Sequence, residues 1–133
     1  MTDAGRGDRA FTIAARLTSI GHALEGVRLM LRTQHNAWLH LTATVVVVAA
    51  GLILGLTSEA WLALILAIVI VWVAEALNTA FELLCDVASP DFHPVVKAAK
   101  DVAAGAVLLS AIGAAIVGTI VFLPRVIRLL ALN

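Results

Sequence analysis

Charged residues are scarce in this chain, and their scarcity indicates the class of protein. Of the 133 residues, 14% are charged and 62% are hydrophobic, whereas soluble domains carry about 25% charged residues. The nine basic and nine acidic residues cancel, so no basic surface that would attract nucleic acid is expected. The composition predicts a small integral membrane protein with no nucleic-acid partner.

Several other features are missing as well. A single cysteine, Cys85, excludes an internal disulfide and any metal site built from several cysteines. The N-terminal residues lack an apolar core followed by a small-residue cleavage site, so no cleavable signal peptide is expected. Neither a G-x-x-x-x-G-K-[ST] loop nor a Gly-rich kinase loop occurs, so any nucleotide site would be an unconventional one.

What the chain does have is three long apolar runs. They predict transmembrane helices over about 37–56, 59–87 and 95–123. A short turn at residues 56–59 implies antiparallel neighbours, with Ser58 as the N-cap of the second span. Pro124 is expected to end the third span. The fold class is therefore all-α, with every span in one membrane domain over residues 11–133.

The N-terminal part differs from these runs. Residues 1–10 are rich in Gly, Asp and Arg and are predicted to be a disordered tail. Residues from about 11 to 34 form an amphipathic pattern that predicts a helix lying in the membrane interface, with Arg16 toward lipid phosphates. Seven of the nine basic residues fall on the side of this helix and of the 89–94 turn. The positive-inside rule places that side in the cytoplasm.

The most informative stretch runs from Glu75 to Asp101. At about 100° per residue, Glu82 and Asp86 lie within about 20° of Glu75 on a helix, and Asn78 lies about 60° away. One helix face thus carries three carboxylates and an amide next to apolar side chains, which is energetically costly and marks a functional candidate.

Three interpretations of this face are open from the residues alone. It can be a polar seam in which Glu75 pairs with Lys100 and Asn78 bridges helices. It can be a proton or cation path. It can also be a metal–nucleotide site, in which Glu82 and Asp86 supply oxygens for Mg²⁺, a lysine binds phosphate, and Glu75 is a base for a lipid hydroxyl.

The motifs in this stretch resemble a known family. E-A-L-N-T-A-F-E at 75–82, S-P-D-F-H-P at 89–94 and A-K-D-x-A-A-G-A-V-L-L at 99–109 are similar to the prokaryotic diacylglycerol kinases, which are small trimeric membrane lipid kinases. Within that family the pattern looks more like the undecaprenol kinase branch. The resemblance covers about residues 16–123 and is most specific between Glu75 and Asp101.

The resemblance implies a fold and a set of site residues. The fold would be a surface helix plus three transmembrane helices in a homotrimeric bundle, with active sites between subunits at the cytoplasmic face of a bacterial plasma membrane. Glu75 would be the catalytic base and, with Arg16, would contact the lipid. Glu82 would hold the Mg²⁺ of ATP. The implied nucleotide contacts are Asn78, Glu82, Asp91, Phe92, His93, Lys100 and Asp101.

Two positions depart from the family pattern. The family usually has glutamate in an E-x-N motif before the first span, where it helps to hold the metal, and the matching residue here is Gln34. An amide oxygen can still bind Mg²⁺, but without a charge. Trp38 stands where the family usually has arginine. His22, His35, His40 and Cys85 are not assigned to the site.

These observations predict an ATP-dependent lipid kinase that transfers the γ-phosphate to undecaprenol or else to diacylglycerol, with Mg²⁺ as cofactor. Its partners would be ATP, a membrane lipid alcohol and two further copies of the chain. The alternative is a non-enzymatic family member that serves as a binding or packing protein, or as a small cation-conducting bundle.

Overall fold

The computed structural model describes residues 12–131, which form four α-helices. They are α1 (Ile13–Thr33), α2 (His35–Ile53), α3 (Ser58–Ala88) and α4 (Pro94–Ala131). No strand occurs in this part of the chain. The predicted tail at 1–10 and the first residue of the expected surface helix lie outside the described residues.

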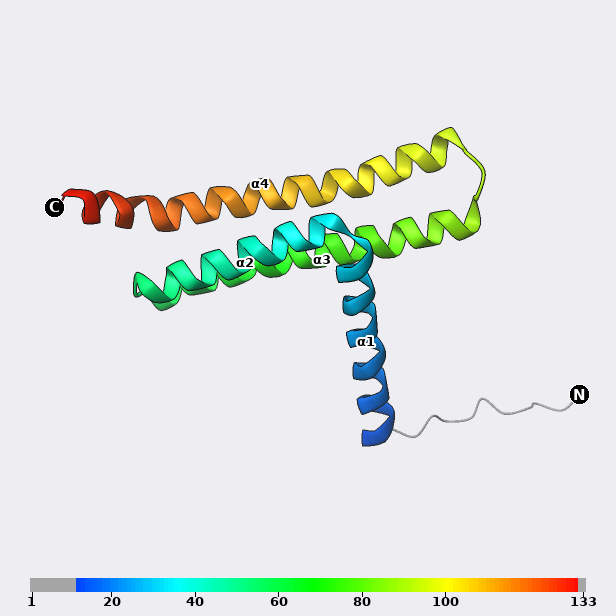
Figure 1. Ribbon diagram of the computed structural model, residues 1–133, viewed down its shortest axis with the longest axis horizontal. Helices are drawn as coiled ribbons and strands as arrows, with labels where there is room; N and C mark the ends of the chain where they lie inside the picture. The colour runs from blue at the N-terminus through cyan, green and yellow to red at the C-terminus, as the bar shows by residue number, and fades with distance from the viewer. Residues whose placement is uncertain (1–11, 132–133) are drawn as a thin grey trace, which may run out of the picture.

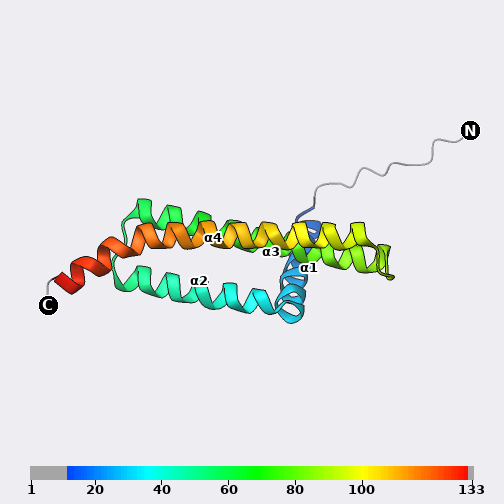
Figure 2. The same ribbon diagram turned by 90° about the horizontal axis from the view of Figure 1, so that it is seen from above.

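Helices α2, α3 and α4 run alongside one another, and α1 does not (Figures 1 and 2). α3 makes its most extensive contact with α4 and a smaller one with α2. α1 projects roughly at right angles from this group (Figures 1 and 2). The extended backbone of Gln34, with φ −107° and ψ 116°, separates α1 from α2 and produces the change of direction.

The three helices that lie side by side, α2, α3 and α4, are membrane spans. Each of α2, α3 and α4 is long and apolar enough to cross a bilayer. In the most apolar 18-residue stretch of each helix, only 11–17% of the residues are buried inside the chain. Most large apolar side chains therefore face outward, where lipid or neighbouring chains replace water. The predicted all-helical membrane class is confirmed.

The connection between α2 and α3 is tight and depends on one glycine. Gly55 adopts φ +58°, a left-handed conformation that glycine reaches without a steric penalty. Its neighbour Leu56 bonds back from its backbone N to the carbonyl of Gly51 at 3.2 Å. A Cβ on Gly51 would lie 2.8 Å from Trp61 Cη2, so the absence of a side chain lets α3 approach α2 closely here.

Two helix ends differ from the sequence prediction. The N-cap of α3 is Thr57, not Ser58, because the Thr57 hydroxyl accepts a hydrogen bond from the backbone N of Ala60 at 3.5 Å. α4 does not end at Pro124 but continues to Ala131. Pro124 has no N–H to donate to the carbonyl of Ile120. The neighbouring carbonyl of Val121 accepts from Nη1 of the Arg125 side chain at 2.6 Å. The last turns of α4 run at an angle to the rest (Figure 2), as a proline inside a helix produces.

Candidate functional site

The site is built around the carboxylate of Glu82 on α3. Its Oε2 accepts from Gln34 Nε2 at 2.9 Å, and its Oε1 accepts from Asn78 Nδ2 at 3.2 Å. Asn78 lies one turn earlier on the same helix, at the i, i+4 spacing that brings side chains together. Gln34 comes from the junction of α1 and α2. Residues 48 positions apart in the chain thus meet at one carboxylate.

The oxygens around Glu82 suit a hard cation. Asn78 is 6% exposed, and its Oδ1 is buried without a hydrogen-bond partner. Carboxylate and amide oxygens are the ligands that Mg²⁺ takes in proteins, so Glu82, Asn78 and Gln34 fit such an ion once the Gln34 amide presents its oxygen. Within residues 12–131, no three His, Cys, Asp or Glu side chains gather as a metal site. The side chain of Gln34 is an amide and is not one of these four types, so the cluster around Glu82 does not form such a group.

Glu75 lies two turns before Glu82 and is fully enclosed. Its exposure is 0%, and neither carboxylate oxygen has a hydrogen-bond partner. Leaving a buried carboxylate unbonded is costly, so this position is not explained by stability. In the polar seam considered from the sequence, Lys100 would pair with Glu75. It does not do so in the structure. Its Nζ bonds Asp86 Oδ1 at 2.9 Å instead.

The lysines at the start of α4 form exposed ion pairs. Lys97 Nζ lies 2.6 Å from Asp101 Oδ2, four residues later on the same helix, and Lys100 links α4 to Asp86 on α3. Exposed pairs of this kind are screened by solvent and contribute little to stability. Both lysines can therefore exchange their carboxylate partner for a phosphate at little cost.

The remaining implied contacts lie farther from Glu82. Asp91, Phe92 and His93 are exposed on the α3–α4 connection, where His93 Nδ1 accepts from the backbone N of Val95 at 3.3 Å. Arg16 is exposed on the first turn of α1, roughly 27 Å along that helix from Gln34 at 1.5 Å per residue. Within a single chain, the structure brings Gln34, Asn78 and Glu82 into contact but not these four residues.

His40 was not assigned from the sequence, yet it belongs to the same region. Its Nε2 lies 3.8 Å from Glu75 Oε2. With Gln34, Asn78 and Glu82 it lines a cavity of about 260 Å³ between α2, α3 and α4. The signal in the sequence was a lone histidine near the start of an apolar run, which is equally typical of a residue at the headgroup level.

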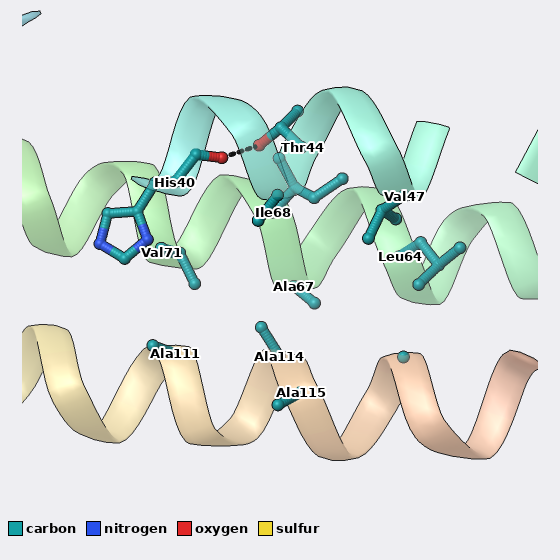
Figure 3. A pocket seen from close by; sticks show the side chains of 12 residues that line it. His40, Thr44, Val47, Leu64, Ala67, Ile68, Val71, Ala111, Ala114 and Ala115 are labelled. Carbon is teal, nitrogen blue, oxygen red and sulfur yellow. Dashed lines mark hydrogen bonds between the residues drawn. The ribbon is translucent and has the colours of Figure 1, made fainter. Parts of the chain in front are cut away.

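A second cavity, almost entirely apolar, shares His40 and Ala111 with this one. It holds about 350 Å³ and is lined by residues of α2, α3 and α4. Figure 3 shows small side chains from α4, Ala111, Ala114 and Ala115, facing Leu64, Ala67 and Val71 of α3 across it. The small side chains of α4 leave this space open beside the polar site.

Comparison with known proteins identifies the group to which this arrangement belongs. The sequence model of the family described as prokaryotic diacylglycerol kinase matches residues 21–122. The chain belongs to the prokaryotic diacylglycerol kinase family. This confirms the resemblance seen in the 75–101 motifs, and the match covers the second half of α1, all of α2 and α3, and most of α4.

Two relatives in the prokaryotic diacylglycerol kinase family are similar over most of the chain. An undecaprenol kinase of Bacillus subtilis is 37% identical over 107 residues, which are 80% of this chain and 87% of that protein. A diacylglycerol kinase of Synechocystis is 40% identical over 115 residues, which are 86% of this chain and 66% of that protein. The names of the two relatives give different lipid alcohols as substrates, and this chain is similarly identical to both. Sequence identity alone therefore does not indicate which lipid accepts the phosphate.

Proposed function

We propose that this protein is a membrane lipid kinase that transfers the γ-phosphate of ATP to a lipid alcohol. The observation that carries the proposal is the buried carboxylate of Glu75, which accepts no hydrogen bond and lies two turns from the Gln34–Glu82–Asn78 cluster, in a member of a lipid kinase family. A base and a set of metal-binding oxygens on one helix face are what phosphoryl transfer to a hydroxyl requires.

The roles follow from the chemistry of each group. Glu75 accepts the proton of the lipid hydroxyl as its oxygen forms a bond to the γ-phosphorus, while the bond from that phosphorus to the β-phosphate oxygen breaks and ADP leaves. Glu82, with the amide oxygens of Asn78 and Gln34, would hold Mg²⁺. When bound, this ion neutralises phosphate charge. Lys100 leaves Asp86 to bind phosphate oxygens.

Undecaprenol is the proposed acceptor, with diacylglycerol as the second candidate. Support comes from the undecaprenol kinase relative, of which this chain covers 87%, and from the apolar cavity beside His40. Asp91, Phe92 and His93 are proposed to contact the nucleotide, together with Asp101. Arg16 is proposed to contact the lipid headgroup region from α1.

The assembly is proposed to be a homotrimer in a bacterial plasma membrane, with the N-terminus and the site toward the cytoplasm. Within one chain, Asp91, Phe92 and His93 are exposed on the α3–α4 connection and do not contact the Glu82 cluster, so residues from neighbouring chains would complete each site. Light scattering of the protein in detergent should give the mass of three chains, and the mass of one chain would contradict the trimer.

The decisive experiment is a transfer assay. Purified protein in lipid vesicles receives labelled ATP with Mg²⁺ and either undecaprenol, diacylglycerol or a plain long-chain alcohol. Labelled undecaprenyl phosphate as the main product supports the proposal. Labelled phosphatidic acid instead would reassign the acceptor. No labelled lipid with any acceptor, together with ATP-independent ion flux through the vesicles, would favour a non-enzymatic cation-conducting bundle.

A further inference from the structure

His40 and Glu75 form a buried pair that the cluster around Glu82 does not use. The distance from His40 Nε2 to Glu75 Oε2 is 3.8 Å, and the side chains are 16% and 1% exposed. His40 Nε2 and both Glu75 oxygens are buried with no hydrogen-bond partner. At 3.8 Å the two groups are too far apart for a hydrogen bond, but a small movement of either side chain would form one. Such contacts are often long before substrate binds.

The imidazole is held in place from the other side. The rings of His40 and Trp72 meet edge to face, with centroids 6.5 Å apart and planes at 69°. Trp72 Nε1 donates to Thr44 Oγ1 at 3.1 Å, and that hydroxyl donates to the backbone carbonyl of His40 at 2.7 Å. The last of these bonds is drawn in Figure 3. Thr44 therefore anchors the indole of Trp72, and the edge-to-face contact of that indole restricts the ring of His40 beside Glu75.

His40 also borders two cavities. It lines both the apolar cavity between α2, α3 and α4 and the polar cavity that contains Gln34 and Glu82. A lipid whose chain lies in the apolar cavity would bring its hydroxyl past His40 to reach the phosphate. The residues of α4 that line the polar cavity bring no titratable group to the pair: Ala104, Val107, Leu108 and Ala111.

We propose that His40 is a positioning residue for Glu75. It donates a hydrogen bond from Nε2 to the carboxylate in the substrate complex and turns the carboxylate toward the lipid hydroxyl. The reason is physical: a buried carboxylate with no donor has no fixed orientation, and His40 carries the donor that the structure places next to it. The inference rests on the proposed lipid kinase function and adds the residue that orients its base.

The test compares three variants in the transfer assay. His40→Ala should lower kcat about tenfold to a hundredfold, the factor expected for one hydrogen bond to a charged group, with KM for ATP unchanged. His40→Gln, whose amide N–H can occupy the place of Nε2, should restore most of kcat. Added imidazole should raise kcat of His40→Ala, because the ring it replaces lined two cavities. His22→Ala on exposed α1 is the control and should behave as wild type.

The outcomes separate this proposal from the proposed function. A wild-type protein with no transfer to any lipid overturns both. An active wild type with an equally active His40→Ala overturns the positioning role alone. A purely structural role for His40 would lower kcat without rescue by glutamine or imidazole. Should His40→Ala fail to fold, histidine ¹⁵N NMR of wild type and Glu75→Gln replaces it. The His40 signals should shift while those of His22 do not, and unchanged His40 signals would overturn the contact.

Discussion

At the residue scale, the main feature is the carboxylate of Glu75, whose burial without a hydrogen bond lowers the stability of the fold. Glu75 is enclosed between helices with both oxygens unbonded, whereas Glu59, on the same helix, is exposed in the first turn, a favourable place for an acid. Glu59 and Glu75, two of the three glutamates of α3, therefore differ in what their removal should do. This contrast supplies a matched control within one helix.

Glu75→Gln should reduce lipid phosphorylation by about 10²–10⁴-fold, the usual contribution of a general base, while leaving the fold intact. Glutamine has nearly the same shape and lacks the basic oxygen. The measurement is kcat in the transfer assay, together with thermal unfolding. Glu59→Gln should keep wild-type kcat. Near-normal turnover of Glu75→Gln would show that Glu75 is not the base.

Gln34→Glu tests the metal cluster. A glutamate here would face Glu82 at hydrogen-bond distance, so two carboxylates would repel each other without a cation and hold Mg²⁺ more tightly with one. The half-maximal Mg²⁺ concentration for activity should fall, and the thermal stabilisation by Mg²⁺ should increase. Gln34→Leu, which has no oxygen, should raise the Mg²⁺ requirement. An unchanged requirement in both variants would place the metal elsewhere.

The sequence predicted some of these contacts and missed others for clear reasons. Spacing at i, i+4 was enough to place Asn78 beside Glu82, because both lie on one helix. The contact of Gln34 with Glu82 crosses 48 residues and was reached only through the family motif. His40 was missed because its partner lies on another helix, and no periodicity within one helix reports the rotation of its neighbour.

At the element scale, the membrane spans were predictable because long apolar runs without breakers leave few alternatives to helix. Helix ends were less predictable. Thr57 and Ser58 are adjacent and both can cap a helix, so composition does not choose between them. Pro124 removes one N–H donor from the helix but does not fix its end, because α4 continues through it to Ala131.

The cap assignment gives a prediction for α3. Thr57→Ala should destabilise the protein by about 0.5–2 kcal/mol, since the hydroxyl that accepts from Ala60 is lost. Ser58→Ala, one residue later and already inside the helix, should have a smaller effect. Unfolding of both variants in mixed detergent micelles compares them. A larger loss for Ser58→Ala would return the N-cap to that residue.

At the scale of the whole molecule, cysteine labelling can test which side of the membrane each end of α3 faces. The single native cysteine is first removed. In a Cys85→Ser background, Asp91→Cys and Glu59→Cys place one exposed thiol at each end of α3. A membrane-impermeant maleimide added to intact cells should label Glu59→Cys, on the outer side, and not Asp91→Cys, which faces the cytoplasm under the positive-inside rule. The reverse pattern would put the proposed site outside the cell and contradict an ATP-dependent function.

The tight α2–α3 connection bears on how the protein enters its membrane. Only residues 54–57 separate the two spans, and the stretch from Leu54 to Glu59 contains a single charged side chain. A helical hairpin with so small a polar tip can partition into the bilayer as one unit, carrying little polar material across the hydrocarbon. Biogenesis of this protein would then depend mainly on how its two helices pair during insertion, and Gly51 and Gly55, which shape that hairpin, would control its yield more than its activity.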